Sequence, residues 1–334
     1  MSSANKVLII QTAFLGDAIL ISSLLEKMWI ESPETIIHLL VRKGNESIFQ
    51  AYPHANLAQV WAYDKKQKWA SWRSLQKDLR AEKFDQVFVA QRFFGMGLLS
   101  LSIGAKKVIG FDKNPLSWFF TERVTHDWGN GKHETERNTA LLTSWLGSKV
   151  YKPFLSLAGD NVVPVENYIC ISPGSVWETK RTPVRVWIDF IKLLPASQPV
   201  VLMGAPNEVH LAEEIEMACP QNTIVNEAGK HGLVDAIRIY QHSMMSYVND
   251  SGPMHICSAV DTPTVAVFCS TIPAFGFGPL ASWNRIVEVK NLACRPCGDH
   301  GKISCPLGHY ACGNQITGNQ LFKSYEELLA ARSK

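Results

Sequence analysis

The sequence of 334 residues has little net charge and no long apolar run. Its 33 Lys and Arg residues against 30 Asp and Glu leave a formal charge of +3, which argues against a nucleic-acid-binding protein. A run of about 18 uncharged apolar residues, as a membrane-spanning helix needs, is absent. The polar start, Met1 to Lys6, leads directly into the apolar run Val7–Ile10 and does not resemble a signal peptide. We therefore expect a cytoplasmic protein.

Several widespread catalytic sequences are also missing. Without a G-x-x-x-x-G-K-[ST] loop the chain is not expected to be a P-loop kinase or ATPase, and there is no H-E-x-x-H zinc sequence. The G-x-G at Gly95–Gly97 lacks the third glycine of the dinucleotide fingerprint. No D-x-D pair occurs, so any diphosphate must find its positive charge in protein side chains. We predict neither a metal at the site nor a cofactor.

Short apolar runs alternate with amphipathic stretches along most of the chain, which predicts an α/β protein with parallel sheets. The length favours two domains, and the aperiodic segment Ser156–Asn167 is the predicted boundary between residues 1–155 and 156–334. The predicted strands are Val7–Ile10, Ile36–Val41, Val87–Ala90, Val108–Gly110, Tyr168–Ser172, Val200–Met203, Met245–Asn249 and Thr264–Cys269. The predicted helices include Ala18–Met28, Trp69–Leu79, Val209–Ala218 and Leu233–His242.

The loop after the first strand contains Gly16, which suits a tight turn, and Asp17 at the start of a helix. Two interpretations of Asp17 stay open. As an N-cap it would satisfy backbone N–H groups and complement the helix dipole. As a general base it would stand at a strand end, although N–H groups that bind a carboxylate lower its pKa and weaken it as a base.

Two loops of the second half carry groups suited to a nucleotide, because ligands of open α/β sheets bind at the carboxyl ends of strands. The loop Ser172–Pro183 contains Ser175, Lys180 and Arg181, which suit a diphosphate or are simply solvated. Glu208 follows the strand at Val200 and would accept the hydroxyls of a ribose, although Glu is also common in a first helical turn.

A further loop, Asn249–His255, combines capping and small residues at a predicted helix start. Pro253 fits the first helical position, and the free N–H groups of that turn form an anion site. His255 lies in the same turn, where it either faces the ligand or is packed in the core.

Three sequence segments together resemble a known family. They are K-V-L-I-I-Q-T-A-F-L-G-D at the start, P-G-S…K-R-T-P, and N-D-S-G-P-M-H-I-C-S-A-V-D-T-P-T-V-A-V-F. These segments, with H-E-T-E-R-N at His133–Asn138 and F-G-F-G-P at Phe275–Pro279, are similar to the ADP-heptose:lipopolysaccharide heptosyltransferases of glycosyltransferase family nine. The similarity covers nearly the whole chain, and its cysteine-rich end is most similar to the heptosyltransferase II branch.

The resemblance implies a GT-B fold, with two Rossmann-like domains facing each other across a cleft and a final helix, Tyr325–Arg332, crossing back to the first. It implies inverting, metal-independent transfer of heptose from ADP-heptose to the lipopolysaccharide inner core. The first domain would bind the acceptor and the second the nucleotide sugar, with peripheral contact to the inner membrane. Asp17 matches the general base and Lys180 the diphosphate lysine that stabilises the leaving group; the donor-binding residues are Gly16, Ser175, Lys180, Glu208, Asp250, Ser251, Gly252 and His255.

The chain departs from the family at Thr182, where a tryptophan is common, and this bears on nucleotide packing. Two alternative functions stay open. One is a sugar-nucleotide epimerase of the same fold, which would need no acceptor. The other is a relative that binds nucleotide sugar without turnover.

Four of the eight cysteines lie close together near the end of the chain, in the pattern Cys294-x2-Cys297-x7-Cys305-x6-Cys312, with His300 and His309 nearby. Structural thiols, reduced or disulfide-linked, are one interpretation. A structural zinc site and a redox dithiol are the others.

Overall fold

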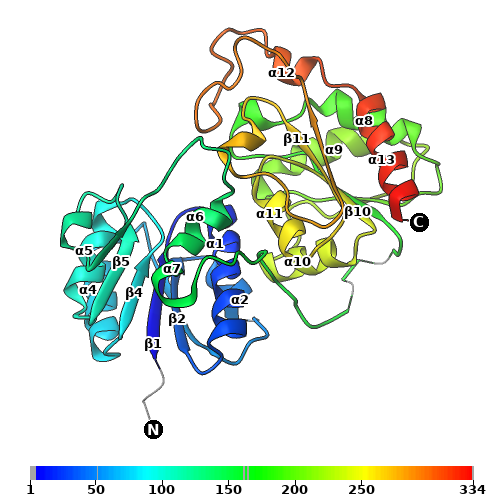
Figure 1. Ribbon diagram of the computed structural model, residues 1–334. Helices are drawn as coiled ribbons and strands as arrows, with labels where there is room; N and C mark the ends of the chain where they lie inside the picture. Colours follow the sequence, from blue (N-terminus) through cyan, green and yellow to red (C-terminus); the bar gives the residue numbers. More distant parts are fainter. Residues whose placement is uncertain (1–4, 51, 161, 164, 333–334) are drawn as a thin grey trace. The chain divides into compact units, whose positions relative to one another are not determined.

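The computed structural model describes residues 5–50, 52–160, 162–163 and 165–332. The chain divides into two compact units, Met1–Leu157 and Ala158–Lys334, and the division falls within the predicted boundary segment. In Figure 1 the first unit runs from blue to green and the second from green to red. Each unit contains one six-stranded parallel sheet with helices packed against it. The predicted α/β class is thereby confirmed.

The sheet of the first unit has the strand order β3-β2-β1-β4-β5-β6. Its strands are β1 (Lys6–Gln11), β2 (Ile36–Arg42), β3 (Leu57–Tyr63), β4 (Gln86–Val89), β5 (Lys107–Phe111) and β6 (Glu122–Val124). Its helices are α1 (Leu15–Leu20), α2 (Ser22–Glu31), α3 (Glu46–Gln50), α4 (Lys68–Ala81), α5 (Phe94–Ser102), η1 (Ser117–Phe119), α6 (Glu134–Ala140) and α7 (Thr143–Leu146).

The sheet of the second unit repeats this topology, with the order β12-β11-β10-β7-β8-β9. Its strands are β7 (Ile169–Ser172), β8 (Val200–Leu202), β9 (Ile224–Asn226), β10 (Met245–Asn249), β11 (Thr264–Phe268) and β12 (Asn284–Glu288). Its helices are η2 (Glu178–Lys180), α8 (Val184–Leu193), η3 (Pro206–Glu208), α9 (Val209–Ala218), α10 (Leu233–His242), α11 (Gly252–Ala259), η4 (Pro273–Phe275), α12 (Ala311–Asn314) and α13 (Gly318–Arg332). Both orders are those of a dinucleotide-binding Rossmann sheet.

The eight predicted strands are all present, and the four that the sequence did not reveal are β3, β6, β9 and β12. These four are the edges of the two sheets. The inner strand β1 is buried along Val7–Ile10, because helices cover both faces of a parallel sheet, and such strands are continuous apolar runs. The edge strand β9 is only partly buried and mixes Ile224 and Val225 with Asn226, so it lacks that signal.

The helix predicted over Ala18–Met28 is in fact two helices, α1 and α2, separated at Ile21. The hydroxyl of Ser22 donates to the carbonyl of Ile19 at 2.7 Å, and that of Ser23 donates to the carbonyl of Leu20 at 2.8 Å. Serine hydroxyls that bond to the backbone of the preceding turn compete with regular helix geometry. The prediction therefore missed the break at Ile21, which the hydroxyl groups of Ser22 and Ser23 promote.

The last helix, α13, begins at Gly318, earlier than predicted, and packs within the second unit against α8 and β12. The contact is close at its start, because a Cβ atom on Gly318 would lie 2.6 Å from the backbone nitrogen of Phe190. The ring of Phe190 in turn packs against that of Tyr247 on β10, with centroids 4.3 Å apart. The predicted crossing of this helix to the first domain stays a prediction.

We expect Gly318→Ala to lower the free energy of unfolding of the second unit by about 1–3 kcal/mol, because backbone atoms of α8 must move to admit the methyl group. Urea titration followed by circular dichroism measures this change. Gly278→Ala is the control, because its added Cβ would lie at an ordinary 3.7 Å from Cβ of Pro273; it should change stability by less than about 0.5 kcal/mol. Equal effects of both substitutions would contradict the close approach of the helices.

Candidate functional site

Asp17 lies in the first turn of α1, as predicted, but it is not the N-cap. The N-cap is Phe14, whose backbone is extended, and the helix begins at Leu15. Asp17 is therefore the third helical residue, and Gly16 precedes it inside the turn. The loop is held at its base by Gln11, whose amide donates to the carbonyl of Ala90 at 2.8 Å. Asp17 therefore does not occupy the N-cap position, but as an acid in the first turn it bonds the backbone N–H groups of Phe14 and Asp17, as the capping interpretation required.

The surroundings of Asp17 raise its pKa to about 6, from an ordinary value of 3.8. Burial is the largest cause, because it disfavours the charged carboxylate, and the negative charge of Glu134 adds to it. Backbone N–H groups of Phe14 and Asp17, together with the cation of Lys65, offset part of the rise. The N–H groups that would weaken Asp17 as a base are therefore present, but burial outweighs them.

Glu134 is a site residue that the sequence did not single out, although it lies in the H-E-T-E-R-N segment. It opens α6, whose N-cap is His133, and its carboxylate is buried. Oε2 of Glu134 accepts a hydrogen bond from Nε of Arg137 at 2.6 Å, and Oε1 lies 3.5 Å from Nε2 of His126. Burial alone would raise the pKa of Glu134, but these two neighbours outweigh it and hold the pKa below its usual range.

In the second unit, Asn249 at the end of β10 fixes the loop that follows β7. Its amide nitrogen donates to the carbonyls of Pro173 at 2.8 Å and Gly174 at 3.1 Å. Its amide oxygen accepts hydrogen bonds from the backbone N–H and the hydroxyl of Thr182, at 2.9 and 2.7 Å. Thr182, the residue that departs from the family pattern, is therefore buried in the loop as a structural hydroxyl.

The same loop carries Lys180, which the fold brings to Asp250. Nζ of Lys180 lies 2.7 Å from Oδ2 of Asp250, and the hydroxyl of Thr271 donates to the same oxygen at 2.5 Å. Arg181, which the sequence offered as a second cation, instead donates through Nε to the backbone carbonyl of the buried Ser175 at 2.8 Å. Lys180 is thus oriented by a buried acid, and Arg181 stabilises the loop.

Helix α11 begins beside this ion pair. Its N-cap is Ser251 and its first residue is Gly252, so Pro253 occupies the second helical position rather than the predicted first. Proline is tolerated there because the first turn has no intrahelical partner for its N–H. His255 is buried in the same turn, with its ring edge-on to Phe277 at 6.2 Å. The positive end of the helix dipole therefore lies at the carboxyl edge of the sheet.

Glu208 ends η3, after β8, and lies against the loop of Lys180. Its Oε2 accepts a hydrogen bond from the N–H of Ala205 at 3.0 Å. A Cβ atom on Gly174 would collide with the Glu208 carboxylate, so the absence of a side chain at Gly174 lets the two loops meet. The predicted donor residues of the second unit thus gather on three neighbouring strand ends, while Gly16 and Asp17 belong to the first unit.

The cysteine-rich segment is packed against the Lys180 loop. The N–H of Lys302 donates to the hydroxyl of Thr179 at 2.8 Å, and the N–H of Thr179 donates to the carbonyl of Lys302 at 3.1 Å. Arg295 donates to the carbonyl of Thr271 at 2.6 Å and pairs with Glu288 at 2.6 Å. The segment therefore supports both Lys180 and the threonine that binds Asp250.

All eight cysteines are free thiols. Among the residues that the structure describes, no three His, Cys, Asp or Glu side chains form a group that could hold a metal ion. The turn after Cys305 directs backbone N–H groups of residues 307–310 at its sulfur, and these outweigh the effect of burial and lower the pKa of the thiol. Analysis of the metal content of the purified protein tests the zinc interpretation, which predicts about one equivalent of zinc per chain.

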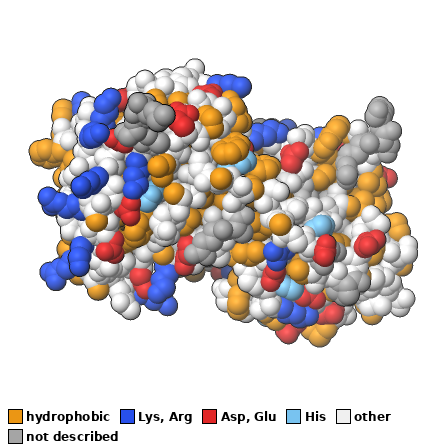
Figure 2. Space-filling model, turned by 90° about the horizontal axis from the view of Figure 1, so that it is seen from below, with side chains coloured by type: hydrophobic (Ala, Val, Ile, Leu, Met, Phe, Trp, Pro, Cys, Tyr) orange, Lys and Arg blue, Asp and Glu red, His pale blue; other side chains and the backbone are white. Residues whose placement is uncertain are grey.

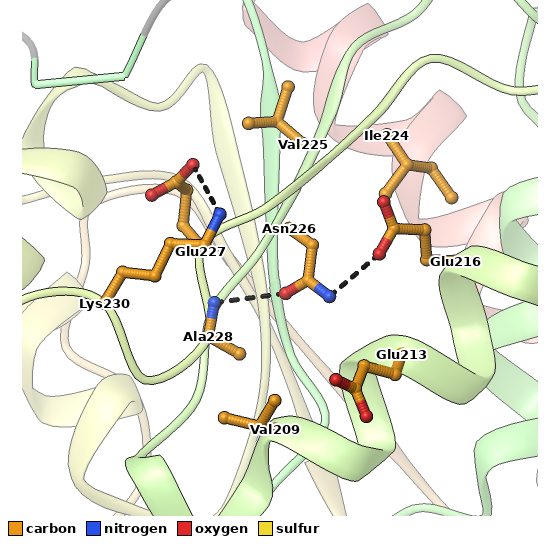
Figure 3. A pocket seen from close by; sticks show the side chains of 9 residues that line it. All are labelled: Val209, Glu213, Glu216, Ile224, Val225, Asn226, Glu227, Ala228 and Lys230. Atoms are coloured by element: carbon orange, nitrogen blue, oxygen red, sulfur yellow. Dashed lines mark hydrogen bonds and ion pairs between the residues drawn. The ribbon is translucent and has the colours of Figure 1, made fainter.

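A pocket of about 440 Å³ lies between α9 and the edge strand β9. Figure 3 shows that its polar groups pair with one another: Asn226 with Glu216 and with the N–H of Ala228, and Lys230 with Glu227. Carboxylates outnumber cations among its lining residues, so it does not suit an anionic diphosphate. None of the predicted site residues lines it.

Two Rossmann-like units with polar carboxyl edges define a two-domain α/β protein, and solved structures identify this fold as GT-B. The chain is similar to an Escherichia coli ADP-heptose lipopolysaccharide heptosyltransferase II, with a TM-score of 0.81, 20% identity and coverage of 98% of this chain and 100% of that one. A family 9 glycosyl transferase from Veillonella parvula gives a TM-score of 0.82 at 18% identity, with 99% of each chain covered.

The family model of Glycosyltransferase family 9 (heptosyltransferase) matches residues 72–310, more than half of the chain. The chain therefore belongs to this family and is a glycosyl-transfer enzyme. Similar curated proteins include the lipopolysaccharide core heptosyltransferase OpsX of Haemophilus influenzae, 24% identical over 305 residues that cover 85% of this chain and 84% of OpsX. Lipooligosaccharide heptosyltransferase 2 of Campylobacter jejuni is 23% identical over 334 residues, with 97% and 99% covered. The resemblance deduced from the sequence is confirmed.

We expect Asn249→Ala to destabilise the second unit, because the carbonyls of Pro173 and Gly174 and the N–H of Thr182 lose their partner at once. Each buried polar group left unpaired costs about 1–3 kcal/mol. Thr182→Val is the milder comparison, at about 1 kcal/mol, because Asn249 keeps its other hydrogen bonds. Urea unfolding checks both variants. If Asn249→Ala were no more destabilising than Thr182→Val, the loop would be held by other contacts.

Proposed function

We propose that this chain transfers a heptose, with inversion and without a metal, from ADP-heptose to the inner core of lipopolysaccharide. The observation that carries the proposal is the meeting of Lys180, Asp250 and Glu208 on adjoining strand ends, in a chain that belongs to a heptosyltransferase family. Relatives named lipopolysaccharide core heptosyltransferase support the substrate class. The enzyme would act in the cytoplasm, at the inner face of the membrane that holds its acceptor.

The donor would bind along the carboxyl edge of the second sheet. Lys180 and the N-terminus of α11 would hold the diphosphate, because both present positive charge. Asp250 would orient Lys180 rather than touch the phosphates, since a carboxylate repels them. Glu208 bonds the Ala205 N–H through Oε2, which leaves Oε1 to accept the ribose hydroxyls. Ser175, Ser251, Gly252 and His255 would shape the surrounding turns.

The chemical step would be a single displacement. An acceptor hydroxyl attacks the anomeric carbon of the heptose as the bond from that carbon to the ADP oxygen breaks, and Asp17 takes the hydroxyl proton. A pKa near 6 suits this role, because the carboxylate is ionised at neutral pH yet holds a proton better than an ordinary aspartate. Lys180 stabilises the negative charge that grows on ADP.

The proposed metal independence rests on how the diphosphate charge is balanced. The chain has no D-x-D sequence to hold a divalent ion on the donor. Lys180, oriented by Asp250 and Thr271, offers a fixed cation at the strand end where the diphosphate would bind. Turnover that is unchanged by an excess of chelator would support this part of the proposal, and its loss would contradict it.

The pKa of Asp17 predicts the pH dependence of turnover. Activity should rise as pH increases through about 6 and level off at higher pH, because only the ionised carboxylate accepts a proton. Glu134→Gln should move the midpoint to lower pH, since it removes the negative charge that raises the pKa of Asp17. Steady-state rates between pH 5 and 9 measure both profiles.

Asp17→Asn should lower kcat by about 100- to 10,000-fold and leave the affinity for ADP within about twofold. Asp78→Asn, on the exposed face of α4, is the control and should retain full activity. If the Asp17→Asn variant kept the wild-type kcat, Asp17 would not be the general base.

Gly174→Ala should weaken ADP binding by about tenfold or more with little loss of stability, because the added methyl group displaces the Glu208 carboxylate, the flexible end of a side chain. Gly204→Ala is the matched control, since its Cβ would lie at an ordinary 3.4 Å from Cβ of Glu208. Titration calorimetry with ADP measures the affinities. Equal affinities in the two variants would argue against Glu208 as a ribose ligand.

The proposed function is tested by incubating the enzyme with ADP-heptose, with and without an inner-core acceptor. Release of ADP that requires the acceptor is expected. Conversion of the nucleotide sugar without an acceptor would indicate an epimerase instead, and ADP binding without any turnover would indicate a non-catalytic relative. A thermal-shift comparison of ADP, UDP and GDP tests the base, because ligand at 100 times its Kd adds about 2.7 kcal/mol of stability.

A further inference from the structure

Helix α5 of the first unit has an unusual composition for a surface helix. From Phe93 to Ala105 the sequence contains no charged residue. One face of α5 is buried through Met96 and Leu99, but Phe94 and Leu98, one turn apart, are exposed on the other. A helix that is apolar on both faces normally has both faces covered. Phe94 is 54% exposed and Leu98 is 37% exposed, so this face is only partly covered.

Further aromatic side chains are exposed on the elements around α5. Trp118 and Phe119 in η1 are 78% and 72% exposed, and Trp69 at the start of α4 is 76% exposed. Phe93, directly before α5, is half exposed. We call this set the aromatic edge; it consists of Trp69, Phe93, Phe94, Leu98, Trp118 and Phe119.

Side-chain hydrogen bonds hold these elements together. The amide of Asn114, just before η1, donates to the carbonyl of Phe93 at 3.1 Å. The indole N–H of Trp72 on α4 donates to the carbonyl of Gly95 in α5 at 3.2 Å. The segments that carry the aromatic edge are therefore joined at the start of α5, and they follow the carboxyl ends of β3, β4 and β5, which lie along one edge of the parallel sheet.

The surroundings of the aromatic edge are basic. The segments 66–69, 92–94 and 113–119 contain four Lys or Arg residues, and Asp64 and Asp112 lie just before two of these segments. Lys66, Lys68, Arg92 and Lys113 are exposed. The guanidinium of Arg123 lies 3.9 Å from the ring centre of Trp118. By contrast, the view from below in Figure 2 shows, at the left, Lys and Arg side chains mixed with Asp and Glu as well as with hydrophobic side chains.

We infer that the aromatic edge docks the enzyme on an anionic lipid bilayer. Tryptophan and phenylalanine settle at the boundary between headgroups and acyl chains, and Lys and Arg beside them attract acidic lipids. Charge complementarity selects this partner, because the exposed charged residues beside the rings, Lys66, Lys68, Arg92 and Lys113, are all cations. No described helix is long and apolar enough to cross a bilayer, so the contact is one of insertion at the surface.

This inference does not depend on the identity of the sugar donor or acceptor. Lys65 interacts electrostatically with Asp17 and lies 5.8 Å from the ring centre of Phe93, so it adjoins both the candidate catalytic edge and the aromatic edge and is left out of the docking test. The lipid contact would bring that edge to the membrane that holds the proposed acceptor.

The test is flotation of the full-length protein with vesicles that contain no lipopolysaccharide. Vesicles of phosphatidylethanolamine and phosphatidylglycerol should bind the protein, and vesicles of phosphatidylcholine should bind it at least tenfold less. The double variant Trp118→Ser with Phe119→Ser should lose binding at least tenfold. Its matched control is Met217→Ser with Trp283→Ser, two exposed apolar residues of the second unit, which should bind as wild type does.

A charge test is independent of the aromatic residues. Lys66→Glu with Lys68→Glu should abolish the preference for acidic vesicles, whereas Lys192→Glu with Lys323→Glu, exposed in the second unit, should not. Melting temperatures and turnover of a delipidated acceptor should be unchanged in the Trp118 and Phe119 variant, which shows that it folds. Absence of wild-type binding to acidic vesicles, or binding only when lipopolysaccharide is included, would overturn the proposal. If the protein binds acidic vesicles but transfers no heptose, the proposed function is contradicted and the docking proposal is not.

Discussion

The pairing of β10 with β7 is the constraint on which the second unit's site depends. Because the two strands are parallel, Asn249 at the end of one reaches the loop that follows the other. That single side chain satisfies two carbonyls, one N–H and one hydroxyl, and so sets the course of the chain toward Lys180. The next residue, Asp250, then receives the lysine. Strand pairing thus positions a cation that lies far from its acid in sequence.

In the first unit, burial and the negative charge of a neighbouring acid raise the pKa of Asp17. In the second unit, an ion pair with Asp250 fixes the position of Lys180. Glu134 keeps its charge because Arg137 and His126 compensate it, and this retained charge raises the pKa of Asp17. A group that accepts a proton and a group that stabilises a leaving anion need opposite surroundings. The two units provide them separately, with a partly desolvated acid in one and an oriented cation in the other.

In both units, hydrogen bonds from one segment hold a neighbouring loop in place. The cysteine-rich segment bonds to Thr179 and Thr271 and so holds the residues that flank and orient Lys180. Asn114 joins the segment before η1 to the residue that precedes α5. In each case a polar side chain or backbone group ties a loop to a strand end, and the sheets serve as the rigid base.

The sequence by itself determined the α/β class and the eight inner strands, because inner strands are buried on both faces. It also led to most of the candidate site residues, because strand ends carry the polar loops. It did not reveal the edge strands, of which β9 is an example, since a half-exposed strand has no continuous apolar run. Only the tertiary structure decided that Asp17 is not an N-cap, that Glu134 raises its pKa and that Arg181 turns into its own loop. These properties depend on distances between residues far apart in sequence, which local patterns do not encode.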